Sequence, residues 1–149
     1  MIVLREGRIV QTGTPREILD EPANLDVARL LGAFNLLPAE IRALDPGRNT
    51  SRIQIGGFEL EGPYFPGRLK GDRVTICVRP EHLSVMARNG RPGPNQIPGE
   101  LERAVQKPQL VRLEFTGGIA VDVSRAEYER QREKKQWTIE FPPSALRAL

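Results

Sequence analysis

The stretch LDVARLLGAFNLLPAEIRALD, Leu25–Asp45, holds the point at which the chain changes from helical to β-like character. Before that point, apolar residues recur at the spacing of one helix face: Val27, Leu30 and Leu31. Gly32 follows them and suits the left-handed residue that commonly ends a helix. After Gly32 the chain breaks into short β-like runs, beginning with NLLPAEIRALD. The sequence therefore predicts a helical lead-in, residues 1–32, and a β region, residues 33–149.

The lead-in is expected to contain a β-hairpin and two short helices. MIVLREGRIVQ at its start reads as two β-rich pieces around a turn. Thr14 and Glu17 have the spacing of a capping box, in which each side chain bonds the backbone amide of the other. Pro22 ends this first helix, and Asn24 can cap the second. Since a strand needs a neighbour, the hairpin raises the question of which larger sheet it belongs to.

The chain has 14 Gly and 13 Pro, which favour turns. These turns divide the β region into short strands. Gly-Gly pairs at Gly56-Gly57 and Gly117-Gly118 lie between apolar runs and predict tight hairpins. Arg88–Gly99 is a loop by composition, rich in proline and glycine. One helix interrupts the strands, because Ser124 and Glu127 have the spacing of a second capping box. These features predict a β barrel or a β sandwich.

Composition and charge exclude several classes of function. The formal net charge of +3 comes from 22 basic and 19 acidic side chains, which interleave rather than form one patch. Nucleic-acid binding is therefore not expected, although the pI of 9.4 keeps a single-strand-binding barrel as a hypothesis to test. Cys77 is the single cysteine, so it reads as a buried strand residue in a reducing compartment. No apolar run approaches the roughly 18 residues that would span a membrane.

The sequence also lacks the motifs that an active site or a metal centre would need. His82 is the only histidine, so a zinc site is not expected. Neither GxSxG nor the phosphate-binding GxxxxGK[ST] occurs. The carboxylates of Glu127, Glu129 and Glu133 fit a solvated helix face. These residues alone are therefore not expected to form an enzyme, and no catalytic, cofactor-binding or metal-binding residue is assigned.

The stretch EGRIVQTGTPREILDEPANLDVARLLGAFNLL, Glu6–Leu37, strongly resembles the segment that leaves the nucleotide-binding domain of importer-type ABC transporter ATPases. In that family a Gly-Arg-Ile-Val-Gln strand precedes a Gly-Thr-Pro helix, a Pro-Ala-Asn turn, a helix ending in glycine, and an Asn-Leu pair. The matching positions follow the same order: Gly7–Gln11, Gly13–Pro15, Pro22–Asn24, Gly32 and Asn35-Leu36. The length and order of the match make this resemblance specific.

Two later stretches resemble the same family. LKGDRVTICVRPEHLSV, Leu69–Val85, is similar to its Gly-Asp-x-Val and Val-Arg-Pro-Glu strand and turn, and FPPSALRAL is similar to its closing strand. The resemblance identifies the β region as a TOBE (transport-associated OB) domain, which implies a small OB-like barrel. The expected fold is mainly β, with the hairpin and two helices of the lead-in taken from the end of an ABC ATPase domain. The family's usual Gly-Asp turn is absent before QWTIEF.

The resemblance implies a regulatory and dimerisation domain of the ATP-hydrolysing subunit of an ABC importer. The Walker A, Walker B and signature motifs are absent, so we expect a C-terminal fragment, with ATP and Mg bound in an upstream domain. Its expected partners are that ATPase domain, a second copy of the chain and, through the whole subunit, the membrane permease. The expected location is cytoplasmic, peripheral on the inner face of the membrane. These residues do not reveal the transported solute.

The same resemblance makes a prediction about the hairpin at the start of the chain. Four apolar residues would lack their native sheet partner: Ile2, Val3, Ile9 and Val10. They are expected to be disordered, folded onto the barrel, or paired with another copy. An isolated and unpaired extended strand over Gly7–Gln11 would contradict this expectation.

The segment Arg79-Pro80-Glu81-His82 is the best candidate for a regulatory element. Pro80 disfavours helix at Arg79 and can open a helical turn, which would project Glu81 and His82 at a strand end. In one interpretation, Arg79 and Glu81 contact a second regulatory domain or the ATPase domain. In the other, they form a local salt bridge that shapes the turn.

An alternative function is oxyanion binding. MARN, Met86–Asn89, resembles the Ser-Ala-Arg-Asn motif of molybdate-binding members of the family, with Met86 in place of the serine. The candidate oxyanion loop is then Ala87, Arg88 and Asn89, and the domain would sense molybdate, tungstate or sulfate. The role of the Arg88–Gly99 loop stays open, as does dimerisation of the fragment without its ATPase domain.

Overall fold

The computed structural model describes residues 1–88, 90–133 and 136–149, so the candidate residue Asn89 lies outside the described chain. The strands are β1 (Ile2–Arg5), β2 (Arg8–Thr12), β3 (Asn35–Asp45), β4 (Thr50–Ile55), β5 (Phe58–Pro63), β6 (Arg73–Val78), β7 (Ser84–Ala87), β8 (Gln96–Gln106), β9 (Val111–Phe115), β10 (Ile119–Val123), β11 (Gln136–Glu140) and β12 (Arg147–Ala148). The helices are α1 (Pro15–Asp20), α2 (Leu25–Leu31) and α3 (Arg125–Gln131), with 3₁₀ turns η1 (Pro80–His82) and η2 (Pro143–Ala145).

The lead-in folds into a hairpin and two helices, as the sequence predicts. β1 and β2 pair antiparallel around a turn in which Glu6 and Gly7 have positive φ angles of 52° and 77°, the backbone of a tight type I′ hairpin. The capping box is present, with Glu17 N donating to Thr14 Oγ1 (3.2 Å) and Thr14 N donating to Glu17 Oε2 (3.1 Å). Gly32 ends α2 with a left-handed φ of 63°.

The hairpin has one covered face and one open face. A small apolar core lies between the hairpin and the two helices: Val3, Ile18 and Val27. Large apolar side chains on the open face are exposed, at 59% for Ile2, 55% for Leu4 and 62% for Ile9. β2 is thus paired with β1 rather than isolated, and this two-stranded sheet packs on the helices of the lead-in rather than on the β region. The expectation that these residues are disordered or folded onto the barrel was wrong.

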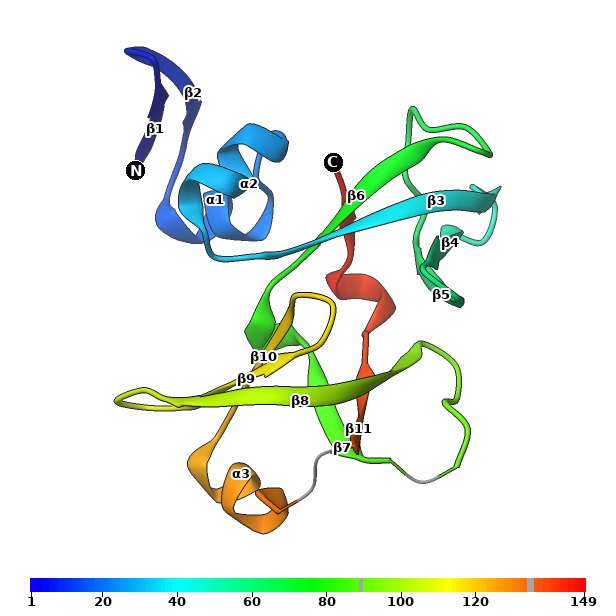
Figure 1. Cartoon of the computed structure of the whole chain (residues 1–149). Helices are drawn as coiled ribbons and strands as arrows, with labels where there is room; N and C mark the ends of the chain where they lie inside the picture. The colour runs from blue at the N-terminus through cyan, green and yellow to red at the C-terminus, as the bar shows by residue number, and fades with distance from the viewer. Residues whose placement is uncertain (89, 134–135) are drawn as a thin grey trace.

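The β region contains two five-stranded antiparallel sheets that curl around a shared apolar core. The first sheet has the strand order β12-β6-β3-β4-β5, and the second has the order β10-β9-β8-β11-β7. In Figure 1 the first sheet lies beside the lead-in, and the second lies below it with α3 at its far end. The expected mainly β, OB-like fold is confirmed, and the structure adds that it is built from two curled half-barrels.

An internal repeat in the sequence underlies the two sheets. NLLPAEI, residues 35–41, begins β3, and NQIPGEL, residues 95–101, leads into β8, with Asn, Pro and Glu at equal places. Each long strand carries a register shift at the corresponding position, around Arg42 in β3 and around Glu102 in β8. Such bulges bend a strand and increase its twist, so they help each sheet to curl.

The two repeats exchange their last strands. VTICVRPEHLSV, residues 74–85, runs through β6, η1 and β7, and WTIEFPPSALRA, residues 137–148, runs through β11, η2 and β12. β7 pairs with β11, whereas β12 pairs with β6. The registers correspond, because Ser84 lies opposite Glu140 and Arg147 lies opposite Cys77. Each sheet is therefore completed by a strand of the other repeat.

Two asparagines join each repeat to an edge strand of the other. Asn35 is only 4% exposed, and it donates from Nδ2 to Ala120 O and accepts from Ala120 N, both at 2.8 Å. Asn95 makes a matching pair with Glu61, donating to its carbonyl (2.7 Å) and accepting from its amide (2.9 Å). Because β10 and β5 are edge strands, each side-chain amide takes the place of a neighbouring strand for one residue.

The core is closely packed where β8 lies beside β11. A Cβ atom on Gly99 would fall 2.8 Å from Ile139 Cδ1 and 2.9 Å from Phe115 Cδ1. Phe115 in turn contacts Trp137 edge to face, with ring centroids 6.2 Å apart. Since Phe115, Trp137 and Ile139 are all buried, this part of the second sheet has room for glycine alone.

The loop predicted over Arg88–Gly99 is shorter than expected. β8 begins at Gln96, and its residues Pro98 and Gly99 lie opposite Thr138 and Trp137 of β11. Composition suggested a loop because proline and glycine are rare in strands. Here the glycine serves close packing across the core, which composition does not reveal.

Candidate functional site

Arg79 is the centre of the candidate site, at the junction of β6 and η1. Its Nε donates to Glu81 Oε1 at 2.8 Å, and its Nη1 donates to Asp20 Oδ1 of α1 at 3.0 Å. The first contact is local and spans the turn that Pro80 opens. The second contact joins the β region to the lead-in. The Arg79 side chain is 22% exposed, so solvent screens these pairs only in part.

Arg112 and Asp122 continue this cluster of charges along the second sheet. They lie opposite each other on β9 and β10 and form two hydrogen bonds, at 2.7 and 2.9 Å. The hydrogen bond to Asp122 raises the pKa of Arg112, and the charges of Glu81 and Glu114 add to this effect. Two groups of ion pairs, Asp20–Arg79–Glu81 and Arg112–Asp122, thus lie between α1 and β10 and are called the ionic series here. Among the described contacts Glu81 forms no ion pair with Arg112, and it acts on Arg112 through its charge.

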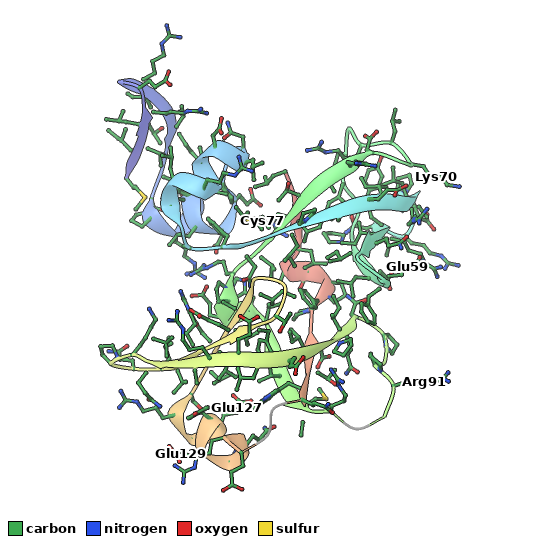
Figure 2. The ribbon with its side chains drawn as sticks, in the orientation of Figure 1. Glu59, Lys70, Cys77, Arg91, Glu127 and Glu129 are labelled. Atoms are coloured by element: carbon green, nitrogen blue, oxygen red, sulfur yellow. The ribbon has the colours of Figure 1, made fainter. Side chains whose placement is uncertain are left out.

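A cavity of about 530 Å³ opens beside Arg79, between the lead-in and the β region. α1 forms one wall, and the end of β6 with η1, η2 and β12 forms the other. The exposed His82 lies at this second wall, so the structure brings all three candidate regulatory residues to the cavity or its rim. Cys77 also lines the cavity, and Figure 2 labels it where the lead-in meets the β region.

The Cys77 thiol is expected to be unreactive in the folded chain. It is 2% exposed, and burial raises its pKa from 9.0 to about 11, although the nearby Arg147 acts in the opposite direction. Because the thiolate is the nucleophile, alkylation by iodoacetamide at about pH 8 should be about 100-fold slower than in the urea-unfolded chain. Mass spectrometry follows the reaction, and equal rates in the two states would contradict the burial.

The candidate oxyanion loop lies at the far end of β7 from η1. Ala87 ends this strand, opposite Trp137 of β11. Arg88 is exposed, and its backbone amide donates to Gln136 O at 3.2 Å, so this amide is already engaged. Within the described ranges the chain has neither a helix fit to cross a bilayer nor a cluster of three acidic, His or Cys side chains placed for a metal ion.

The residues that extend the site beyond η1 are not among the candidates predicted from the sequence. Asp20 lies in a helix whose caps were predicted, but no local pattern connects it with Arg79, which is 59 residues away. Arg112 and Asp122 carry a usable signal, because the predicted turn at Gly117-Gly118 places them opposite each other on one hairpin.

A double-mutant cycle is expected to give a coupling free energy of about 1 kcal/mol between Arg79 and Asp20. The variants are Arg79→Met, Asp20→Asn and their combination, and urea unfolding measures the stability of each. The exposed pair Arg48–Asp45, with a separation of 3.8 Å and side chains 85% and 51% exposed, is the matched control. Its cycle should give a coupling free energy near zero. An equally small value for Arg79–Asp20 would contradict a stabilising contact between the lead-in and the β region.

Comparison with known proteins places the chain among transport subunits. No known protein-family profile matches it. It is 36% identical over 122 residues to the spermidine/putrescine import ATP-binding protein PotA of Nitratidesulfovibrio vulgaris, covering 78% of the chain and 32% of that protein. PotA of Vibrio cholerae is 40% identical over 86 residues, which cover 57% of the chain and 22% of that protein.

A solved structure has the same fold as the β region. It is the cytoplasmic molybdate-binding protein ModG with molybdate bound, which matches with a TM-score of 0.62 at 15% identity. The match covers 76% of the chain and 94% of ModG. At this identity the likeness establishes the fold alone, and that fold is of the TOBE type.

The fold and the sequence matches together define a TOBE-like domain of a transporter subunit. The chain belongs with the importer-type ABC ATP-binding subunits and corresponds to the C-terminal region of PotA-like members. It matches 22–34% of the length of these curated relatives.

Proposed function

We propose that the chain is the C-terminal regulatory and dimerisation region of the ATP-hydrolysing subunit of an ABC importer. The observation that carries the proposal is the 36% identity with PotA over 122 residues. The boundary between the two functional parts would fall at Gly32. It is supported by the left-handed end of α2 and by the two separate apolar cores on either side of it.

In this proposal the lead-in is the end of the ATPase domain. The exposed Ile2, Leu4 and Ile9 would be covered by the remainder of the ATPase sheet, since burial of large apolar side chains is favourable. The upstream residues would bind ATP and Mg and hydrolyse ATP. A second copy of the subunit would pair with the first, and the pair would act at the cytoplasmic face of the membrane, beneath the permease.

The ionic series offers a route by which the ATPase and regulatory parts affect each other. Arg79 bonds α1 through Asp20 and η1 through Glu81. If the lead-in rotated against the β region, the Asp20 contact would break while the Glu81 contact, inside one turn, would stay. The positive charge of Arg79 would then be paired with Glu81 alone. The orientation of the two parts would therefore affect the ion pairs of Arg79. The proposed role of Arg79 is therefore contact with the ATPase part, with Glu81 bonded to Arg79 inside the turn and His82 beside them.

The transported solute is proposed from the relatives. Both PotA proteins are named for the import of spermidine and putrescine. A polyamine is accordingly the first solute to test. Uptake of labelled spermidine by cells with and without the gene would measure it, with a sugar and sulfate as comparison solutes.

The reading frame upstream of Met1 tests the proposed function. It should encode the phosphate-binding GxxxxGK[ST] loop and the ABC signature, and the whole subunit should hydrolyse ATP. In that whole subunit, Arg79→Met should alter the stimulation of ATP hydrolysis by the permease and leave nucleotide binding unchanged. An upstream frame without the phosphate-binding loop would overturn the proposal.

Oxyanion sensing is the second candidate, motivated by the MARN pattern and a fold shared with a molybdate-binding protein. Calorimetry with molybdate, tungstate and sulfate distinguishes it from a purely structural regulatory domain. Saturable binding that Arg88→Ala abolishes would support the sensor. No heat at roughly millimolar ligand would remove it.

A further inference from the structure

Two cavities meet between the lead-in and the C-terminal strand β12. One is the cavity of about 530 Å³ beside Arg79. The other, of about 440 Å³, lies between the loop after α1, the loop after β5 and the end of the chain. Glu21 and Arg147 line both cavities, so the two cavities are adjacent at these residues.

Glu21 and Arg147 carry opposite charges, and within the described residues no ion pair neutralises either one. Arg147 donates from Nη1 to the carbonyls of Ser144 (2.9 Å) and Leu146 (3.1 Å). These bonds hold the guanidinium in place without cancelling its charge. Arg79 in the same cavity differs, because two carboxylates already bind it. Arg147 is therefore a positioned cation available to a ligand.

The second cavity adds an apolar wall to this pair of charges. Proline, aromatic and aliphatic side chains line it: Pro22, Pro63, Tyr64, Phe65 and Leu146. Phe65 and Leu146 belong to the buried core of the β region, so this wall is already formed without a ligand. Arg68 adds a second guanidinium to the lining. Ligand sites commonly combine an apolar pocket with a few polar groups that fix orientation.

We propose that these two adjacent cavities bind a small zwitterion with an apolar side chain, namely an α-amino acid such as phenylalanine, leucine or methionine. The ligand ammonium faces Glu21, and its carboxylate takes the edge of Arg147 that the backbone carbonyls leave unused. The apolar side chain enters the second cavity. The site goes beyond the proposed function, which assigns no ligand to these two cavities.

Both charges of the ligand are needed at this site. A carboxylate without an ammonium would cover Glu21 and leave its charge unpaired, and an amine without a carboxylate would do the same to Arg147. Charge-assisted hydrogen bonds to both Glu21 and Arg147 can form only with a molecule that carries both charges. The site should therefore discriminate against analogues that keep the side chain and lose one charge.

Isothermal titration calorimetry of the 149-residue chain tests the inference with L-phenylalanine, L-leucine and L-methionine. We expect saturable binding, with a dissociation constant on the order of 0.1–1 mM for the best of the three. 3-Phenylpropionate, which lacks the ammonium, and phenethylamine, which lacks the carboxylate, should each bind at least about 10-fold more weakly than phenylalanine.

Variants locate the binding in the two adjacent cavities. Glu21→Gln and Arg147→Gln should each weaken phenylalanine binding about 10-fold, and Arg125→Gln on α3, outside both cavities, should leave it unchanged. Glu21 is exposed, so its variant keeps the test decisive even if Arg147→Gln disturbs η2.

Three results would overturn the inference: no saturable heat from the three amino acids up to about 10 mM, equal binding of the single-charge analogues, or full binding by Glu21→Gln. None of these results bears on the upstream reading frame, so the proposed function stands or fails separately.

Discussion

Gly99→Val is expected to lower the free energy of unfolding by about 3 kcal/mol. A Cβ atom alone would fall 2.8 Å from Ile139 and 2.9 Å from Phe115, which is closer than van der Waals contact allows. Both neighbours are buried, and Trp137 holds Phe115 edge to face, so neither side chain can move aside without disturbing the core. Urea unfolding followed by the fluorescence of Trp137 measures the loss.

Gly57→Val is the matched control for this substitution. A Cβ atom at Gly57 would meet nothing within 4 Å, and Gly57 does not have the left-handed φ of its neighbour Gly56. The expected change is within about 0.5 kcal/mol. If Gly99→Val unfolded at the same urea concentration as Gly57→Val, the packing of β8 against β11 would differ from the one described.

The elements of the fold that depend on neighbouring residues could be predicted from the sequence. Thr14, Asn24 and Ser124 each accept a hydrogen bond from the amide three residues later, as their capping patterns predict. The Gly-Gly pairs form the turns of the β4–β5 and β9–β10 hairpins. These features need only a few adjacent residues to be satisfied, so a single sequence carries enough information to place them.

The division of the β region into two sheets was not predicted, although part of its signal is present. The pattern of Asn, Pro and Glu that begins at Asn35 recurs at Asn95, and a search for internal repeats would have found it. The exchange of β7 and β12 has no such signal. Each of these strands offers the same local pattern whether it pairs within its own repeat or with the other, so tertiary packing decides.

The candidate site also has one contact that the sequence could predict and others that it could not. The contact between Arg79 and Glu81 spans one proline-opened turn, so the sequence offered it as one of two interpretations. The contact with Asp20 depends on how the lead-in packs against β6, and a separation of 59 residues hides it from any local pattern. Glu21 and Arg147 are further examples, because only the folded chain places them at the same two cavities.

Asn35 holds the two repeats together through both ends of its side-chain amide. Its Nδ2 donates to Ala120 O and its Oδ1 accepts from Ala120 N. An aspartate at this position would keep the acceptor and lose the donor. In its charged form it would also set a buried carboxylate oxygen against the carbonyl of Ala120, where no cation lies to compensate it among the described contacts.

Asn35→Asp is therefore expected to cost about 3–4 kcal/mol of folding free energy at neutral pH. At low pH the penalty should shrink, because the protonated acid can donate to Ala120 O and accept from its amide as asparagine does. Burial and the facing carbonyl both favour the neutral acid, which raises the folded-state pKa of the new carboxyl above its unfolded value of about 3.9. The stabilisation that the protonated carboxyl provides is thus fully present below about pH 4 and is lost as the pH rises through the folded-state pKa.

Urea unfolding of the variant and the original chain, compared at each pH from about 3 to 8, measures this dependence. Asn24→Asp is the matched control, because among the described contacts the Asn24 side chain acts only as an acceptor, from Val27 N at 3.0 Å. Aspartate caps a helix as well as asparagine, so this control should stay within about 0.5 kcal/mol throughout. A penalty at Asn35 that did not change with pH would mean that the new carboxyl has the same pKa in the folded and unfolded chain, which would contradict its burial against the carbonyl of Ala120.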